Sequence, residues 1–91
     1  MEFAWDERKN RINKRKHGIS FETAILVFDD PYHLTRQDRE VEGEPRCQTI
    51  GIVNGVHVLL VAHTESEDEA IRIISARKAT HRERSLYAQS N

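Results

Sequence analysis

The dipeptide Asn54-Gly55 is the feature that most constrains the fold of this chain. It separates two runs rich in β-branched and apolar residues. Asparagine and glycine adopt positive φ angles at low cost, as both central positions of a type I′ turn require. The sequence therefore predicts two antiparallel strands, Arg46 to Val53 and Val56 to His63, joined as a hairpin.

Other segments extend this hairpin into a sheet. The isoleucine-rich run from Ile71 to Arg77 predicts a further antiparallel strand, and Tyr32 to Arg36 is compatible with another. Phe3-Ala4-Trp5 is expected to be a strand or an extended opening, and Asp38 to Pro45 an acidic loop. The expected sheet is an antiparallel meander of three to four strands.

Helices are predicted on both sides of the strand region. Asp6 can cap a helix from Glu7 to His17, which contains neither glycine nor proline, and Gly18 suits the left-handed position that ends helices. Ser20 can cap a second helix, and Thr80 to Gln89 predicts a short final one. The second helix has an apolar stripe at helical spacing, made of Phe21, Ala24, Ile25 and Phe28.

This order of elements indicates an α+β fold. A chain of 91 residues has room for one core, so residues 1–91 are expected to form a single domain. One cysteine, Cys47, excludes an internal disulfide and a paired-cysteine zinc site. Because no segment has the length and apolar character of a membrane span or a secretion signal, a cytoplasmic protein without membrane contact is expected.

Charge is segregated along the chain. Residues 7–17 contain six lysines and arginines and one acid, and residues 71–84 contain five and one. Residues 22–70 contain eleven acids and three arginines. If the two basic segments meet in the fold, they form a positive face that attracts phosphate backbones. The alternative is that both segments are solvated surfaces.

The chemistry of such a set of side chains suits RNA cleavage. RNA carries its own nucleophile, the 2′-hydroxyl, so cleavage requires a proton acceptor, a cation on the phosphate and a proton donor. Arginine grips phosphate oxygens in two places and stays charged, and an arginine cluster can stabilise the transition state without a metal. The five histidines are scattered without metal-ligand spacing, so neither a metal nor a cofactor is expected.

The segment from Ile71 to Arg77 carries the sharpest local signal. Strict alternation along a strand would place Arg72, Ile74 and Ala76 on one face. It would place Ser75 and Arg77 on the other, together with Ile71 and Ile73. The strand would then present a hydroxyl and a guanidinium at the rim of the sheet. The alternative is an edge strand whose arginines block aggregation.

Several stretches, spread from end to end, carry a resemblance to a known family. They are Phe3-Ala4-Trp5-Asp6, Asn13, Lys16-His17-Gly18-Ile19-Ser20-Phe21-Glu22 with Ala24, Val27-Phe28-Asp29-Asp30-Pro31, Glu44 with Arg46, Ile50-Gly51, Arg72-Ile73-Ile74-Ser75-Ala76-Arg77 with Ala79, and Glu83-Arg84 with Tyr87. In these the chain resembles the BrnT family of type II toxins, whose fold is similar to that of the RelE ribonucleases.

The resemblance implies a RelE-like sheet flanked by helices and metal-independent RNA cleavage that inhibits translation. It also implies neutralisation by a BrnA-type antitoxin, with a heterotetramer of two copies each, and contact with promoter DNA only through the antitoxin complex. The alternative function is a non-catalytic module that binds RNA, the ribosome or the antitoxin.

The expected site residues follow from the basic set and the resemblance together. Residues expected to act in catalysis are His17, Arg46, Arg72, Arg77, Glu83 and Tyr87. Residues expected to bind RNA are Lys14, Lys16, Ser75, Lys78 and Arg84. As the general base, His17 or Glu83 is expected ahead of Lys16. The alternative for Tyr87 is that it is a core residue.

One segment departs from the family pattern. An acidic stretch, Thr64 to Glu69, stands where a short glycine-containing turn is expected. It would repel phosphate if it lay at the RNA-binding face. It could instead lie on the far side, face the antitoxin, or indicate weak activity.

Overall fold

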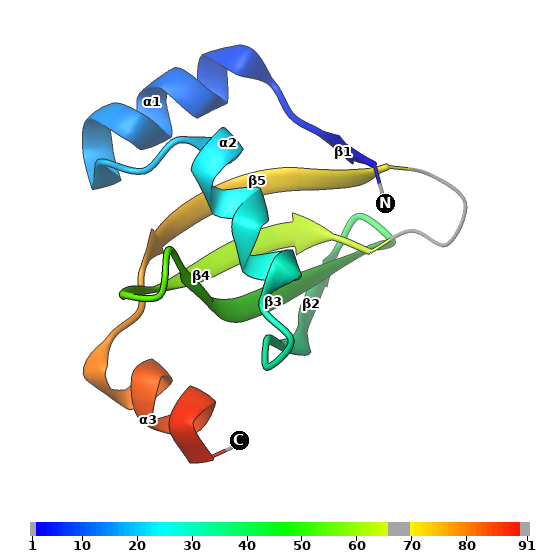
Figure 1. The fold of residues 1–91 in the computed structure, drawn as a ribbon. Helices are drawn as coiled ribbons and strands as arrows, with labels where there is room; N and C mark the ends of the chain where they lie inside the picture. The colour runs from blue at the N-terminus through cyan, green and yellow to red at the C-terminus, as the bar shows by residue number, and fades with distance from the viewer. Residues whose placement is uncertain (1, 66–69, 90–91) are drawn as a thin grey trace.

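A five-stranded sheet forms the centre of the molecule (Figure 1). The computed structural model describes residues 2–65 and 70–89. Its elements are β1 (Phe3–Ala4), α1 (Glu7–His17), α2 (Phe21–Ala24), the 3₁₀ helix η1 (Ile25–Asp29), β2 (Leu34–Val41), β3 (Glu44–Val53), β4 (His57–Thr64), β5 (Ile71–Lys78) and α3 (His81–Gln89). The strand order is β1-β5-β4-β3-β2.

The sheet is larger than expected and mixed in direction, so the prediction of a purely antiparallel sheet of three to four strands is wrong. Four strands form the antiparallel meander β2 to β5, and β1 adds a parallel fifth by pairing Phe3 with Ile71 and Ala4 with Arg72. A two-residue parallel pairing between chain positions this far apart has no local signal in a sequence.

The predicted acidic loop from Asp38 to Pro45 is also wrong. Strand β2 continues to Val41 and β3 begins at Glu44, joined by a turn in which Glu42 and Gly43 have φ angles of 52° and 79°. Because β2 is an edge strand with almost every residue exposed, its polar composition is compatible with a strand.

The local signals for the hairpin and for α1 are confirmed. Asn54 and Gly55 have φ angles of 56° and 72° between β3 and β4. The Asp6 carboxylate accepts hydrogen bonds from the first turn of α1, and Gly18 ends the helix in the left-handed conformation at φ 74°. The next helix, capped by Ser20, changes to η1 after Ala24, so the predicted apolar stripe spans two helix types.

Helices cover the two faces of the sheet unequally. Segment α2–η1 crosses one face (Figure 1), where Phe21 and Val27 pack with Val61 and Ile73 in the main core. Helix α3 packs on the opposite face, with Tyr87 as its one buried residue. The small core under α3 consists of Ile50, Leu60 and Tyr87. None of the helices in the described part of the chain is long and apolar enough to cross a membrane.

Helix α1 lies beside β5, as Figure 1 shows, so the two basic segments do meet. Asn13 makes the join: its amide nitrogen donates to the carbonyl of Ala76 at 2.8 Å, and its side-chain oxygen accepts from the Ala76 N–H at 3.1 Å. The asparagine thus pairs with β5 as a neighbouring strand would, beyond the point where β1 ends.

Candidate functional site

A β-bulge in β5 brings its polar residues to one face of the sheet. Ala62 pairs with Ser75 but His63 pairs with Ile73, so Ile74 is an extra residue in the ladder. The bulge shifts the alternation, and Ile73 and Ala76 both enter the main core. The prediction that Arg72 and Ala76 share a face is therefore wrong. Arg72, Ser75 and Arg77 all face the α3 side of the sheet. A β-bulge commonly changes the direction of side chains in this way.

A three-residue charge cluster lies at the Arg72 end of this face. The Arg72 guanidinium donates to Oε1 of Glu44 at 2.6 Å, and the Arg46 guanidinium lies 3.2 Å from the same oxygen. Glu44 and Arg46 are two apart in β3 and so share this face, while Arg72 comes from β5. Strand β4 lies between them, and its Thr64 hydroxyl accepts from the Arg72 backbone N–H.

Arg46 has unused hydrogen-bonding capacity. Its Nε atom is buried and has no partner among the described residues, although the side chain is one quarter exposed. An unpaired buried donor is costly, and an incoming acceptor would satisfy it. The Arg72 side chain is 51% exposed. The unpaired Nε of Arg46 and the accessible guanidinium of Arg72 make the cluster a candidate anion site.

Arg77 is engaged with Glu83 of α3. Its two terminal nitrogens donate to the two carboxylate oxygens at 2.7 and 2.9 Å, a bidentate pair. Glu83 also accepts from the Thr80 N–H, and the Thr80 hydroxyl accepts from the Glu83 N–H, so the two residues form a capping box at the start of α3. The hydrogen bond from Arg77 and those from Thr80 lower the pKa of Glu83 to about 2 despite its partial burial.

Tyr87 lies in the interior rather than at the open face, at 8% exposure. Its hydroxyl donates to Oδ2 of Asp30 at 2.5 Å. The same oxygen accepts from the N–H of Ile52, a residue of β3 that has no pairing partner in β2. Burial by itself would raise the pKa of Asp30, but these hydrogen bonds and one from Tyr32 outweigh it and lower the pKa. Tyr87 therefore fastens α3 to the sheet.

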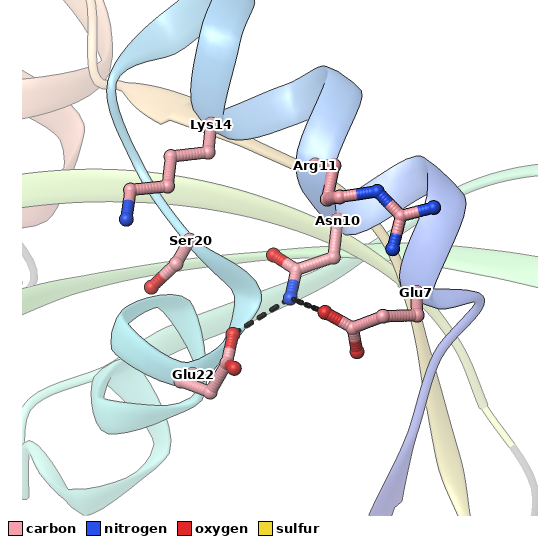
Figure 2. A pocket seen from close by; sticks show the side chains of 6 residues that line it. All are labelled: Glu7, Asn10, Arg11, Lys14, Ser20 and Glu22. Atoms are coloured by element: carbon pink, nitrogen blue, oxygen red, sulfur yellow. Dashed lines mark hydrogen bonds between the residues drawn. The ribbon is translucent and has the colours of Figure 1, made fainter.

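The predicted residues of α1 are divided between two places. Lys16 and His17 line a shallow pocket of about 210 Å³ that also includes Ile74 and Ser75 of β5. Lys14 instead lines a separate pocket of about 320 Å³ between α1 and α2 (Figure 2).

The pocket in Figure 2 is held together by internal hydrogen bonds. The Asn10 amide nitrogen donates to Glu7 at 2.9 Å and to Glu22 at 2.7 Å, and its oxygen accepts from the Phe21 N–H. The hydrogen bond from Asn10 lowers the pKa of Glu22. Every polar atom of the Asn10 amide thus has a partner, and the contacts join α1 to α2.

The last two predicted RNA-binding residues lie at the hairpin end of the sheet. Lys78 and Arg84 line a pocket of about 190 Å³ together with the turn residue Val56 and His57, the first residue of β4. The predicted set thus forms several small groups, of which Lys14 lies apart in the α1–α2 pocket. Along β5, Arg72 and Arg77 are about 16 Å apart at the usual rise of a strand.

Two further expectations concern metals and the acidic segment. In residues 2–65 and 70–89, no three His, Cys, Asp or Glu side chains gather in a way that could hold a metal ion. Most of the acidic segment, residues 66–69, lies outside the described residues. Of its other members, Thr64 contacts Arg72, and Glu65 accepts a weak hydrogen bond from Cys47. Burial and Glu65 raise the pKa of the Cys47 thiol to about 11.

Glu44 is the member of the cluster that was not among the expected site residues. Its spacing of two from Arg46 within a strand was the available signal, because residues i and i+2 share a face. Its second partner, Arg72, is 28 positions away and becomes a neighbour only through the sheet.

The fold and this face define a small α+β protein with an arginine–carboxylate cluster suited to gripping phosphate. A family model described as "Ribonuclease toxin, BrnT, of type II toxin-antitoxin system" matches residues 5–83. The chain belongs to this family of ribonuclease toxins, as the resemblance indicated.

A solved structure supports the assignment. The crystal structure of the Brucella abortus ribonuclease toxin BrnT is similar, with 26% sequence identity and a TM-score of 0.65. The match covers 89% of this chain and 99% of that one. No curated protein matches the chain.

Proposed function

We propose that this protein is an endoribonuclease toxin that cleaves RNA without a metal ion, at the α3-side face of its sheet. The observation that carries the proposal is the convergence of Arg46 and Arg72 on this face, where the buried Nε of Arg46 has no partner within residues 2–65 and 70–89. Cleavage of cellular RNA would inhibit translation in the cytoplasm. The RelE-like character of the fold is part of the same proposal.

The arrangement suits attack by the 2′-hydroxyl on the neighbouring phosphate. Arg46 and Arg72 would hold the phosphate and stabilise the charge that develops in the transition state. The Arg77–Glu83 pair and Tyr87 would act by positioning α3. Other basic and polar residues would bind the RNA on either side of the cluster; these are Lys16, His17, Ser75, Lys78 and Arg84. Lys14 lies in the separate α1–α2 pocket and is not part of this proposed surface.

The proposal extends to the partner. Type II toxin families imply an antitoxin, and a BrnA-type antitoxin that forms an assembly of two toxins and two antitoxins is proposed here. Promoter DNA would be contacted only through that complex. The basic surface of α1, with Lys14, Arg15 and Lys16 in its last turn, would offer an acidic antitoxin segment a second contact.

Incubation of the purified protein with single-stranded RNA in EDTA tests the activity. Products ending in a 2′,3′-cyclic phosphate are expected, and RNA with 2′-deoxy sugars should resist cleavage. Arg72→Ala should lower the rate about 100-fold or more, because a preorganised donor at the phosphate contributes about 3 kcal/mol to transition-state stabilisation. Arg11→Ala, which removes a cation from the α1–α2 pocket, is the matched control and should retain the wild-type rate.

Two results would contradict the proposal. Cleavage that EDTA abolishes would indicate a metal-dependent enzyme. Salt-sensitive RNA binding without any product after long incubation would indicate the alternative, a non-catalytic RNA-binding module.

A further inference from the structure

We propose that Glu44 is the general base that accepts the 2′-hydroxyl proton during RNA cleavage. This assignment rests on the proposed function, since it concerns the same face of the sheet. It differs from the expectation that His17 or Glu83 fills this role. Glu44 is the carboxylate that contacts both arginines of the cluster.

Glu44 has a free oxygen beside two phosphate-binding groups. Both guanidiniums contact Oε1, at 2.6 Å from Arg72 and 3.2 Å from Arg46. Within the described residues, Oε2 makes no hydrogen bond or ion pair. The side chain is 38% exposed, so Oε2 is accessible to an RNA strand that lies on the face. A phosphate held by the same arginines would place its neighbouring 2′-hydroxyl close to this oxygen.

Three other proton acceptors on or beside the sheet are occupied or face away. His17, which was also expected as a base, lines the pocket between α1 and β5, which includes neither Arg46 nor Arg72. Both oxygens of Glu83 accept hydrogen bonds from Arg77, and the pKa of about 2 makes this carboxylate a weak base. The imidazole of His63 is on the opposite face, where it packs against Phe28 and has both ring nitrogens hydrogen-bonded. Asp30 is buried and accepts from Tyr87 and two backbone N–H groups.

The step balances without a cofactor. The O2′–H bond breaks and its proton moves to Oε2 of Glu44, while O2′ forms a bond to phosphorus. The P–O5′ bond breaks, and O5′ takes a proton from solvent water. The protonated carboxyl returns its proton to solvent, so the products are a 2′,3′-cyclic phosphate and a 5′-hydroxyl, and the enzyme is regenerated.

The same contacts would keep the cluster organised between turnovers. Glu44 separates two cations that would otherwise repel each other, and it holds both guanidiniums toward the point where the phosphate binds. A residue with only this structural role would affect RNA affinity and stability. A general base must in addition govern how the rate depends on pH.

Glu44→Gln separates the two roles, because glutamine keeps the shape and Oε1 but cannot accept a proton. The cleavage rate in EDTA should fall about 100-fold or more, the usual contribution of a general base. The Kd for a 2′-deoxy RNA analogue should stay within about threefold or become tighter, since a negative charge is lost from the binding face. The acid limb of the wild-type pH–rate profile should disappear from the residual activity.

Glu42→Gln is the matched control, because Glu42 is an exposed acid in the turn just before β3. It should retain the wild-type rate and pH profile. If Glu44→Gln fails to fold, Glu44→Asp provides the test, with a lowered rate and a retained acid limb expected.

The outcomes distinguish this assignment from the proposed function. If the wild-type protein cleaves RNA and Glu44→Gln cleaves it within threefold of that rate, the assignment of Glu44 is overturned and the ribonuclease function stands. A wild-type acid limb that persists unchanged in Glu44→Gln also overturns it. If the wild-type protein forms no product, the proposed function itself fails.

Discussion

Asn13 shows how one polar side chain can determine the placement of a whole helix. Its amide satisfies both backbone groups of Ala76 and the carbonyl of Ile19, and the residue is 6% exposed. An apolar residue of similar size would pack there but would leave these groups without partners. Helix α1 has only one apolar residue, Ile12, which is half exposed, so α1 depends on such hydrogen bonds for its attachment.

Asn13→Ala is therefore expected to lower the free energy of unfolding by about 2 to 3 kcal/mol, because three buried backbone groups lose their partner. Urea unfolding followed by circular dichroism measures the change. Arg15→Ala on the exposed side of α1 is the control and should change stability by less than about 0.5 kcal/mol. A loss below that value for Asn13→Ala would show that water replaces the amide at no cost.

At the scale of elements, α3 is held by two carboxylates, its own Glu83 and Asp30, which directly follows η1. Glu83 pairs with Arg77 of β5, and Asp30 accepts from Tyr87 of α3. The pKa of each carboxyl is below its ordinary value in the folded protein. Both ions therefore bind protons less readily when folded, and their contribution is present at neutral pH and is lost in acid.

This coupling predicts a pH dependence of stability. The contribution of Glu83 should be complete above about pH 4.5, its ordinary pKa, and should be lost as the pH falls toward about 2. We expect a loss of about 1 to 2 kcal/mol, less than the full shift implies because Arg77 is partly exposed to solvent. Thermal unfolding between pH 2 and pH 6 measures it, and Glu83→Gln should flatten the curve. An equally steep curve in Glu83→Gln would assign the acid sensitivity to other groups.

The elements predicted from the sequence are those with local signals. The Asn54-Gly55 hairpin, the Asp6 cap and the Gly18 terminus each depend on a few neighbouring residues, and all are confirmed. The bulge at Ile74 depends on pairing with β4, which no single segment encodes. The extent of β2 was missed because its polar residues are exposed on an edge strand.

The same distinction applies to the site. The types of residue that phosphate binding needs were recognisable, and Arg46 and Arg72 do converge. Glu44, which contacts both arginines, could not be singled out from the sequence among the other acids. It lies between two guanidiniums only because the fold places β3 and β5 on opposite sides of β4. Tyr87 has the spacing of a residue beside Arg84, yet its position in the core follows from how α3 docks on Ile50 and Leu60.

At the scale of the whole molecule, the main core lies on one face of the sheet and the proposed RNA site on the other. The face under α2 and η1 contains the main core. Val27 of η1 packs directly on Gly51 of β3, where an added Cβ would lie 2.8 Å from the carbonyl oxygen of Val27. The face under α3 contains the smaller core around Tyr87 and presents Arg46 and Arg72. Three basic residues of α1 lie beside β5, where they share a pocket with Ser75; these are Lys9, Lys16 and His17.

The location of bound RNA tests this division most directly. Titration of the ¹⁵N-labelled protein with a 2′-deoxy RNA analogue, followed by amide chemical shifts, identifies the contacted face. The account predicts the largest changes at Arg46, Gln48, Thr64 and residues 72–77, with little change in α2 and η1. Changes confined to α2, η1 and the α1–α2 pocket, with residues 72–77 unaffected, would contradict it.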